Sequence, residues 1–309
     1  MPSLFPFFIL SSFIAESNLS EYLSLPFGKV FKLITGIERN GFVPVIMSII
    51  GGYPVGAKTI AQMYRNSKLT KESAEKLSAV CCLAGPGFLV TFVGVSLMNS
   101  KEAGLILLSS QLISIFLLLI ASRFLFTKNS TEEVRDNRIC KPVGFDELMV
   151  NSVNSSVKSS AGMCGFVILF SAVCEILASF PFMTGNLGAI VMSLLEITTG
   201  LTSKNSALSL EIISALAGFG GICVHMQIFR ELKGIEFSKT KFYIFRFIQS
   251  AVSFVSAKIL LLIFPVSVSV FSSLSEKPQV IFYSNITGCL ILLLTSILFI
   301  LSIRKKHQH

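Results

Sequence analysis

The sequence predicts an all-α fold: a polytopic α-helical membrane protein with about eight transmembrane or re-entrant segments and an internal two-fold repeat of glycine-broken helices. Three observations lead to this prediction. The mean hydropathy is +0.74, and only 14% of the 309 residues are charged. Uncharged apolar runs of roughly 18–25 residues recur, which is the length that crosses a bilayer as a helix. Residues 51–58 place three glycines and a proline directly after an uncharged run.

The first half of the chain contains five predicted segments. They are a short partial span over residues 1–15, an interfacial or re-entrant piece over 22–40, a glycine-rich broken element over 40–64, a span over 77–100 interrupted at Gly85-Pro86-Gly87, and a plain span over 103–122. Within the basic loop 65–76, Thr70 is the predicted N-cap of a helix, and Glu72 suits the first turn of that helix.

The second half again contains five predicted segments. They are a span over 159–180, an apolar segment over 185–201, a second glycine-rich element over 207–229, and spans over 242–265 and 278–303. A polar stretch with charges of both signs separates the two halves. We therefore divide the chain into a first membrane repeat (residues 1–126), a cytoplasmic connection (127–158) and a second membrane repeat (159–309).

The two glycine-rich elements occupy similar places in the two halves. Residues 49–53 precede one basic loop, and residues 216–220 precede another. The sequence therefore pairs these two stretches as corresponding parts of a repeat. The copies have the same orientation if both elements cross the membrane fully, and they are inverted if the elements are re-entrant.

Lysine and arginine predict the orientation of the chain. They gather in loops 65–76, 123–158 and 230–241 and in the tail 304–306, so these segments and the C-terminus are predicted to be cytoplasmic. The loops that are poor in basic residues, 99–102 and 266–277, are predicted to face outward. This topology accounts for the net charge of +9, and we predict no nucleic-acid partner.

Glycine and proline free backbone groups from the helical ladder. Inside a bilayer such backbone persists only where it is buried in protein or lines a wet cavity. In transporters, interrupted helices build the solute site near the middle of the membrane. The residues predicted to contact a solute or a coupling ion are Gly52, Tyr53, Pro54, Gly56, Lys58, Gly85, Pro86, Glu196, Thr198, Gly220, Gly221, His225 and Gln227.

Ionisable side chains at membrane depth cost about 2.5–3.5 kcal/mol each at a helix centre, so each needs a reason. Lys58 would face an anionic or carbonyl-rich solute; alternatively, it snorkels to the cytoplasmic rim. Glu196 would accept hydrogen bonds from a sugar hydroxyl or base edge, couple H⁺ or Na⁺, or pair with Lys58; alternatively, it lies among headgroups. His225 would bind ligand or couple protons, or lie at the rim. Arg246 is interpreted as a snorkelling residue near the end of its span.

Enzyme signatures are absent from the sequence. HExxH, GxSxG and the P-loop do not occur, and both aspartates, Asp136 and Asp146, lie in the polar connection. The seven cysteines are scattered and form no CxxC, which predicts neither a disulfide framework nor a metal site. We therefore predict that the protein is not an enzyme and that it holds no metal or cofactor apart from a coupling H⁺ or Na⁺.

The motif from Gly52 to Lys58, followed by a basic loop and Gly85-Pro86-Gly87-Phe88, resembles bacterial integral membrane proteins that carry the nucleoside-recognition Gate domain. Within that group the chain is similar to the sporulation integral membrane proteins of the YlbJ type. The stretches that carry this resemblance are 4–8, 194–198, 219–227 and 243–249. Position 51 departs from the pattern, because Gly stands where Ser is expected.

The resemblance implies a multi-pass protein of the bacterial plasma membrane that acts as a permease for nucleosides or related small polar solutes. The YlbJ branch links it to spore cortex formation. Its partners would be the lipid bilayer, the solute and, in a homo-oligomer, further copies of the chain. Two alternatives stand beside this function. One is a non-transporting scaffold of the sporulating envelope, and the other is an enzyme acting on lipid-linked cell-wall precursors.

Overall fold

Helices form every regular element in the part of the chain that the structure describes. The computed structural model describes residues 4–125, 144–203 and 207–266. The predicted span over 278–303, the basic tail and residues 127–143 of the predicted connection lie outside these ranges. The prediction of an all-α fold is confirmed.

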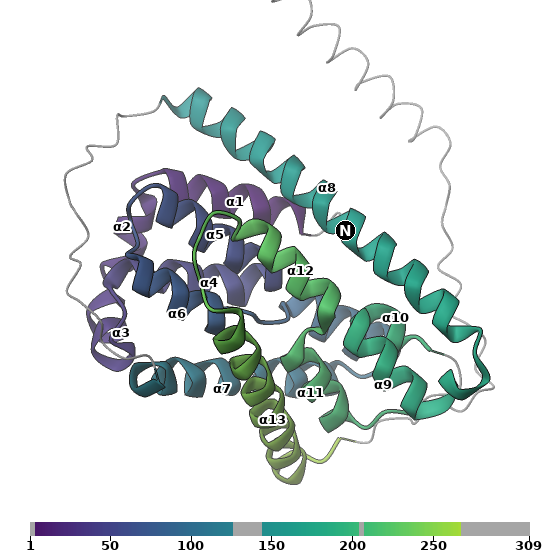
Figure 1. Ribbon diagram of the computed structural model, residues 1–309. Helices are drawn as coiled ribbons and strands as arrows, with labels where there is room; N and C mark the ends of the chain where they lie inside the picture. Colours follow the sequence, from purple (N-terminus) through teal and green to yellow (C-terminus); the bar gives the residue numbers. More distant parts are fainter. Residues whose placement is uncertain (1–3, 126–143, 204–206, 267–309) are drawn as a thin grey trace, which may run out of the picture. The chain divides into compact units, whose positions relative to one another are not determined.

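The elements follow one another along the chain as Figure 1 shows. The first half comprises α1 (Phe5–Glu16), α2 (Leu19–Ser24), α3 (Gly28–Thr35), the 3-10 turn η1 (Arg39–Gly41), α4 (Phe42–Gly51), α5 (Tyr53–Arg65), α6 (Lys71–Val80), the π-helix η2 (Gly87–Leu97) and α7 (Lys101–Leu125). The second half comprises α8 (Phe145–Ala178), the 3-10 turn η3 (Pro181–Met183), α9 (Gly185–Leu195), α10 (Ile197–Leu201), α11 (Leu210–Phe219), α12 (Gly221–Glu231) and α13 (Lys239–Ile263).

Four helical segments among the described residues are long and apolar enough to cross a membrane: 101–124, 145–178, 210–231 and 239–263. A fifth is added if α3 and the helix over 39–51 count as one span, although they are bent by 94°. These segments make the protein a polytopic helical membrane protein, while the count of about eight segments stays a prediction. α8 begins at Phe145, inside the stretch predicted as a polar connection.

The first glycine-rich element forms a helical hairpin. α4 ends at Gly51 and α5 begins at Tyr53, and Gly52 between them has φ 85° and ψ −166°, a conformation that glycine adopts at little cost. A Cβ on Gly56 would lie 2.7 Å from the Cβ of Ser48. These residues lie four positions on either side of Gly52, so they touch only because α5 folds back against α4.

A second hairpin has its tip at Glu196. Gly200 of α10 packs directly on the backbone nitrogen and the hydroxyl of Ser193 in α9, so α10 folds back along α9. The backbone of Glu196 is extended between the two helices, with φ −140° and ψ 111°. The sequence predicted residues 185–201 only as an apolar segment, because a five-residue helix such as α10 has too few positions to show a period.

Two longer helical segments are interrupted rather than folded back. α6 stops at Val80, and residues 81–85 are irregular before η2 begins, so the predicted break at Gly85-Pro86-Gly87 starts earlier than expected. The segment over 210–231 breaks at Gly220, where φ is 92°. α11 then packs on α13 and α7, whereas α12 packs on α5, α8 and α9.

Ion pairs show which helix ends lie together. The Lys71 ammonium at the start of α6 lies 2.5 Å from the Glu236 carboxylate, and its hydrogen bond and charge hold the pKa of that exposed carboxyl below its ordinary value. Lys241 at the start of α13 pairs with Glu75 at 3.1 Å. The Arg65 guanidinium at the end of α5 donates to the Lys233 carbonyl at 3.1 Å. The end of α5, the start of α6, the end of α12 and the start of α13 therefore share one end of the bundle, which we call the basic end.

These contacts favour the inverted form of the predicted repeat, while the repeat itself stays a prediction. α6 leads away from the basic end, whereas α12 leads to it. The hairpin α4–α5 returns to the basic end, where α5 ends. The Ser159 carbonyl of α8 accepts a bond from Arg230 near the basic end. α8 runs from there to the opposite end of the bundle, and the hairpin α9–α10 begins and ends at that opposite end. Each half thus consists of a hairpin, an interrupted helix and a long helix, α7 or α13. In such a repeat this order would pair α4–α5 with α9–α10 and α6–η2 with α11–α12, in place of the predicted pairing of residues 49–53 with 216–220.

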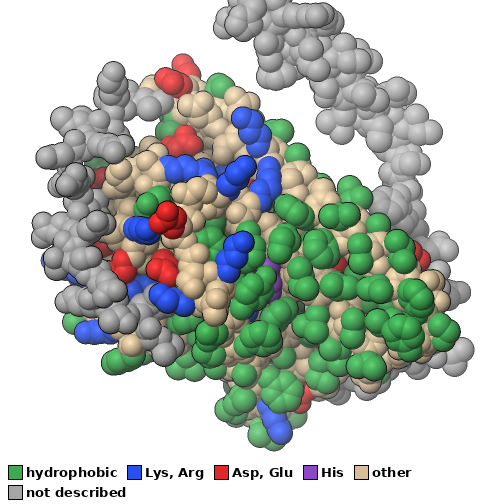
Figure 2. All heavy atoms as spheres, viewed as in Figure 1, with side chains coloured by type: hydrophobic (Ala, Val, Ile, Leu, Met, Phe, Trp, Pro, Cys, Tyr) green, Lys and Arg blue, Asp and Glu red, His purple; other side chains and the backbone are tan. Residues whose placement is uncertain are grey.

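Charged side chains are unevenly distributed over the face shown in Figure 2. Lysine, arginine, aspartate and glutamate gather around α5, α6 and the C-terminal end of α12, and apolar side chains cover the region of α9 to α12. Predicted cytoplasmic loops 65–76 and 230–241 thus lie together, as charge counting requires. Their cytoplasmic location itself stays a prediction.

Candidate functional site

Both hairpin tips lie against breaks in the interrupted helices. A Cβ on Gly52 would lie 3.0 Å from the nitrogen of Gly85 in the first break. A Cβ on Gly221 in the second break would lie 3.0 Å from the Ser193 carbonyl oxygen, near the second tip. The Tyr53 hydroxyl donates to the Ala217 carbonyl, which joins the first tip to the second interrupted helix. We call the region formed by these two tips and two breaks the central site.

Glu196 caps the short helix at its own hairpin tip. Its side chain is buried, with 3% of its surface exposed. Carboxylate oxygens accept hydrogen bonds from the Thr198 nitrogen at 3.1 Å, the Thr199 nitrogen at 2.6 Å and the Thr199 hydroxyl at 2.7 Å. A carboxylate that accepts bonds from the first free backbone nitrogens of a helix stabilises that helix. Glu196 is therefore enclosed by the protein, and its depth in the membrane stays a prediction.

Lys58 is buried, but it points away from the hairpin tip. Its ammonium donates to the Ser156 hydroxyl at 3.1 Å and to the Phe8 carbonyl at 3.4 Å, and it lies 5.2 Å from the centre of the Phe8 ring. Lys58 therefore joins α5 to α1 and α8 instead of pairing with Glu196. With 2% of its surface exposed, it does not extend into water as a snorkelling lysine would.

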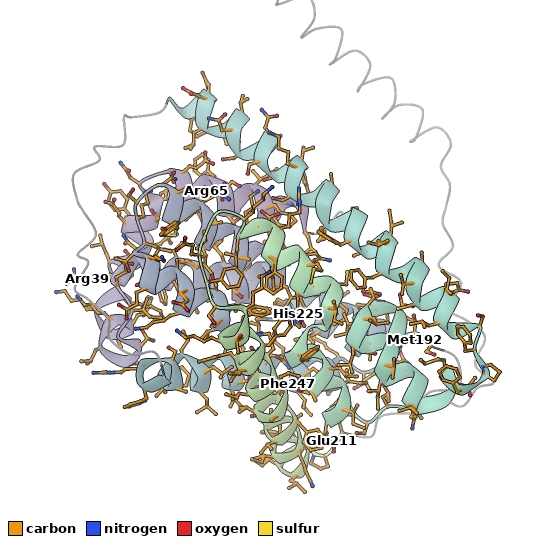
Figure 3. All side chains as sticks on the ribbon, viewed as in Figure 1. Arg39, Arg65, Met192, Glu211, His225 and Phe247 are labelled. Carbon is orange, nitrogen blue, oxygen red and sulfur yellow. The ribbon has the colours of Figure 1, made fainter. Side chains whose placement is uncertain are left out.

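His225 binds a carbonyl that the break at Gly220 leaves near the end of α11. Its Nε2 lies 2.8 Å from the Phe219 carbonyl oxygen, and because that oxygen only accepts, Nε2 carries the hydrogen. The rings of Phe219, Phe242 and Tyr243 surround the imidazole at centroid distances of 4.9, 5.2 and 5.4 Å. His225 is fully buried and lies among the helices, whereas Arg39 and Glu211 lie at the periphery (Figure 3).

Arg246 is the main residue of this region that the sequence did not assign to the site. It is fully buried on α13, and its guanidinium donates to the Ala79 carbonyl at 2.5 Å and the Cys82 carbonyl at 2.6 Å. These carbonyls belong to the last turn of α6 and the irregular stretch after it. Arg246 therefore satisfies backbone groups that the first break sets free, and the snorkelling interpretation is wrong.

Four buried polar atoms at the central site and the breaks that form it have no hydrogen-bond partner among the described residues. They are the hydroxyls of Ser48 and Ser193, one on each hairpin, Nδ1 of His225 and Nε of Arg246. Buried polar groups are rarely unpaired, and an exception calls for an explanation such as a bound water, ion or ligand. The two serines occupy similar places, because each precedes its own tip by about one helical turn.

The other predicted site residues divide between the central site and its surroundings. Gly52, Tyr53, Gly85, Gly220 and Gly221 meet there, and a Cβ on Gly220 would lie 3.3 Å from Cε1 of Tyr53. Pro54 and Gly56 are buried in the first hairpin, and Pro86 precedes η2. Thr198 contributes its backbone nitrogen to Glu196. Gln227 lies one turn beyond Cys223, and its amide donates to that sulfur at 3.3 Å.

A buried polar cluster joins α7, α11 and α13. The amide of Gln111 on α7 donates to the Ser214 carbonyl at 2.8 Å, and the hydroxyls of Ser110 and Ser214 lie 2.7 Å apart. Gln249 of α13 donates to the Gln111 side-chain oxygen at 3.4 Å. Hydrogen bonds between helices hold membrane bundles together. The glutamine in the otherwise apolar run 103–122 was the available sequence signal.

A polar cleft of about 500 Å³ opens beside the second hairpin. Thr199 lines it and donates its hydroxyl to Glu196, so this cleft reaches the tip of the hairpin through one side chain. The remaining lining residues come from α8, α9, α10 and the turns beside them: Cys174, Glu175, Ala178, Ser179, Met183, Thr184, Met192, Thr202 and Ser203.

The chain is 24% identical over 290 residues to the sporulation integral membrane protein YlbJ of Bacillus subtilis (strain 168), and the match covers 80% of this chain and 70% of that protein. The chain is thus similar to YlbJ, as the motif resemblance predicted, and this similarity supports a multi-pass membrane protein. No protein-family model matches the chain, so the Gate domain is not confirmed, and no solved structure matches it.

Proposed function

We propose that this protein is a permease that carries a small polar solute, of the nucleoside class, across a membrane through the central site. One observation supports it most: two hairpins enter from opposite ends, and their tips meet the breaks of two interrupted helices. Inverted repeats with interrupted helices that meet near mid-membrane are the arrangement by which many secondary transporters bind solute. The nucleoside class follows from the Gate-like motif, and a role in sporulation follows from the similarity to YlbJ.

The proposal gives each part of the central site a task. The unpaired hydroxyls of Ser48 and Ser193 and Nδ1 of His225 bind hydroxyl or N–H groups of the solute. The cleft beside Thr199 admits the solute from the end opposite to the basic end. Glu196 couples transport to H⁺ or Na⁺, because protonation or ion binding would compete with its hydrogen bonds to α10. No catalytic step is assigned to any residue.

Serine-to-alanine variants test the proposal in proteoliposomes loaded for counterflow of radiolabelled uridine. An unpaired buried hydroxyl contributes no hydrogen bond to the fold, so Ser48→Ala and Ser193→Ala should leave stability unchanged or raise it. Each variant should lose one hydrogen bond to the solute, worth about 1 kcal/mol, which weakens apparent solute affinity roughly fivefold. Ser12→Ala and Ser152→Ala are matched controls, because these buried hydroxyls also have no partner among the described residues but lie on α1 and α8.

Two results would count against the proposal. If tip variants and control variants transport equally, the solute does not contact the two hairpin serines. If the wild-type protein exchanges neither purine nor pyrimidine nucleosides above empty liposomes, the nucleoside permease is rejected.

A different observation favours the scaffold as a second candidate. Arg246, Glu196 and His225 bind freed backbone groups from within the protein, so the interrupted helices can be stable without any solute. A scaffold would show no uptake in liposomes, and cross-linking in sporulating cells would join it to one constant protein partner.

A further inference from the structure

α3 differs from the helices around it in direction and in surface chemistry. It is bent by 94° from the helix over 39–51, so if α4 enters the membrane, α3 runs along the membrane surface. Lys29 and Lys32 are exposed on α3, and Val30 and Phe31 lie between them in the chain. A helix with cations on one face and apolar side chains on the other is typical of the lipid–water interface.

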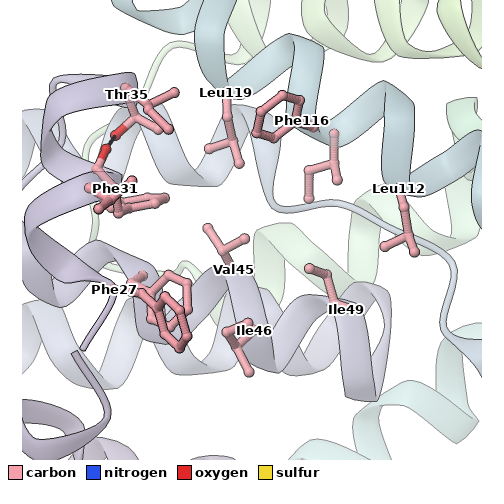
Figure 4. Close-up of a pocket in the computed structure, with 13 residues that line it drawn as sticks. Phe27, Phe31, Thr35, Val45, Ile46, Ile49, Leu112, Phe116 and Leu119 are labelled. Atoms are coloured by element: carbon pink, nitrogen blue, oxygen red, sulfur yellow. Dashed lines mark hydrogen bonds between the residues drawn. The ribbon is translucent and has the colours of Figure 1, made fainter. Parts of the chain in front are cut away.

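An apolar slot of about 290 Å³ lies between α3, α4 and α7 (Figure 4). Phe31, Val45, Ile49, Leu112 and Phe116 are among the residues that line it. Thr35 supplies the one hydroxyl of the lining, and that hydroxyl donates to the Phe31 carbonyl at 2.8 Å. The slot therefore offers its occupant hydrocarbon contacts and no free side-chain donor, which suits an acyl chain.

Positive charge borders the slot at both ends of α3. Arg39 packs beside Gly28 at the start of the helix, where a Cβ on the glycine would lie 2.9 Å from the Cβ of Arg39. Arg123 of α7 reaches the other end, and its guanidinium donates to the Leu33 carbonyl. The nearby acid, Glu38, is directed elsewhere, because its carboxylate accepts bonds from the nitrogen and the hydroxyl of Thr70.

We propose that this slot and its border form a binding site for an anionic phospholipid. One acyl chain fills the slot between α3, α4 and α7, and Lys29, Lys32 and Arg39 bind the phosphate of the headgroup. Basic residues at a membrane surface attract anionic lipids, and apolar burial of the chain adds to that attraction. Since η1 connects α3 directly to α4, the lipid would also steady the hairpin whose tip reaches the central site. The proposal does not depend on transport.

Thermal stability of the purified full-length protein in detergent tests the site. Phosphatidylglycerol should raise the melting temperature by several degrees, phosphatidylcholine should raise it less, and glycerol phosphate without acyl chains should leave it unchanged. The variant Lys29→Gln/Lys32→Gln/Arg39→Gln should weaken the apparent affinity for phosphatidylglycerol roughly a hundredfold at low salt, from about 1 kcal/mol per charge. Lys101→Gln/Lys258→Gln is the control, because both lysines are exposed, Lys101 at the start of α7 at the opposite end of that helix from Arg123, and Lys258 on α13.

A second variant tests the slot itself. Ile49→Trp places a larger side chain in the space assigned to the acyl chain, and native mass spectrometry should then count fewer bound phosphatidylglycerol molecules, while the control double variant keeps them. The proposal is overturned if phosphatidylglycerol and phosphatidylcholine stabilise the protein equally. It is also overturned if the charge variant keeps the full shift, or if Ile49→Trp retains its lipid, in which case another part of the chain or a second copy covers the slot.

Discussion

Replacing Arg246 by methionine tests whether the first helix break is stable because a buried cation caps it. The guanidinium donates to the carbonyls of Ala79 and Cys82, and its side chain is fully buried. Methionine has a similar length and no donor, so both carbonyls lose their partner. Each buried carbonyl left without a donor costs about 1–3 kcal/mol. Removing a buried charge offsets part of that loss, so we expect a net destabilisation of about 3 kcal/mol.

The assay is thermal unfolding in detergent, followed through a fluorescent fusion. Scaling from soluble chains of comparable size, about 3 kcal/mol corresponds to a fall of roughly 6–12 °C in melting temperature. Arg246→Lys should lower the melting temperature by about half as much, because an ammonium lacks the forked geometry that reaches two carbonyls at once.

Lys258→Met is the matched control, since Lys258 lies on the same helix but is exposed. It should change the melting temperature by no more than about 1 °C, as most surface substitutions do. If Arg246→Met unfolds at the same temperature as this control, the guanidinium does not hold the break, and the capping argument is wrong.

Two further predictions concern the hairpin tips. Gly52→Ala should destabilise the protein by about 1–3 kcal/mol, because its φ of 85° is strained for alanine and its Cβ would meet the Gly85 nitrogen at 3.0 Å. Gly87→Ala is the control and should be tolerated, because its Cβ meets nothing within 4 Å. Equal melting temperatures for the two variants would contradict this prediction. Glu196→Gln should cost about 1 kcal/mol, because the neutral amide is a weaker acceptor for the nitrogens of α10, and it should remove any dependence of uptake on H⁺ or Na⁺. Unchanged ion dependence would exclude Glu196 from coupling.

Apolar runs and glycine positions predicted the helical class and both breaks, because these features depend on local chemistry. The N-cap at Thr70 is another local feature, and its hydroxyl accepts a bond from the Ser73 nitrogen as expected. The direction in which each helix runs through the bundle was not predictable in the same way. Whether a glycine such as Gly52 turns the chain back or only interrupts it depends on what packs against it, here Ser48 against Gly56.

Partners of buried ionisable residues were the least predictable part of the site. Lys58, Glu196 and His225 were identified because such residues are rare in apolar runs. Their contacts are set by tertiary structure: Phe8 and Ser156 for Lys58, and backbone groups for the other two. Arg246 was misinterpreted because its distance from the end of α13 allowed snorkelling, and only the position of the α6 carbonyls distinguishes the two outcomes.

The two hairpins also determine the thickness of the barrier between the two ends of the bundle. Neither α4–α5 nor α9–α10 passes from one end of the bundle to the other, so along this line the barrier is the contact zone around Tyr53 and Glu196. If the permease proposal holds, a displacement of one hairpin by a few ångströms would open the interior to a single face, while its counterpart keeps the opposite face closed.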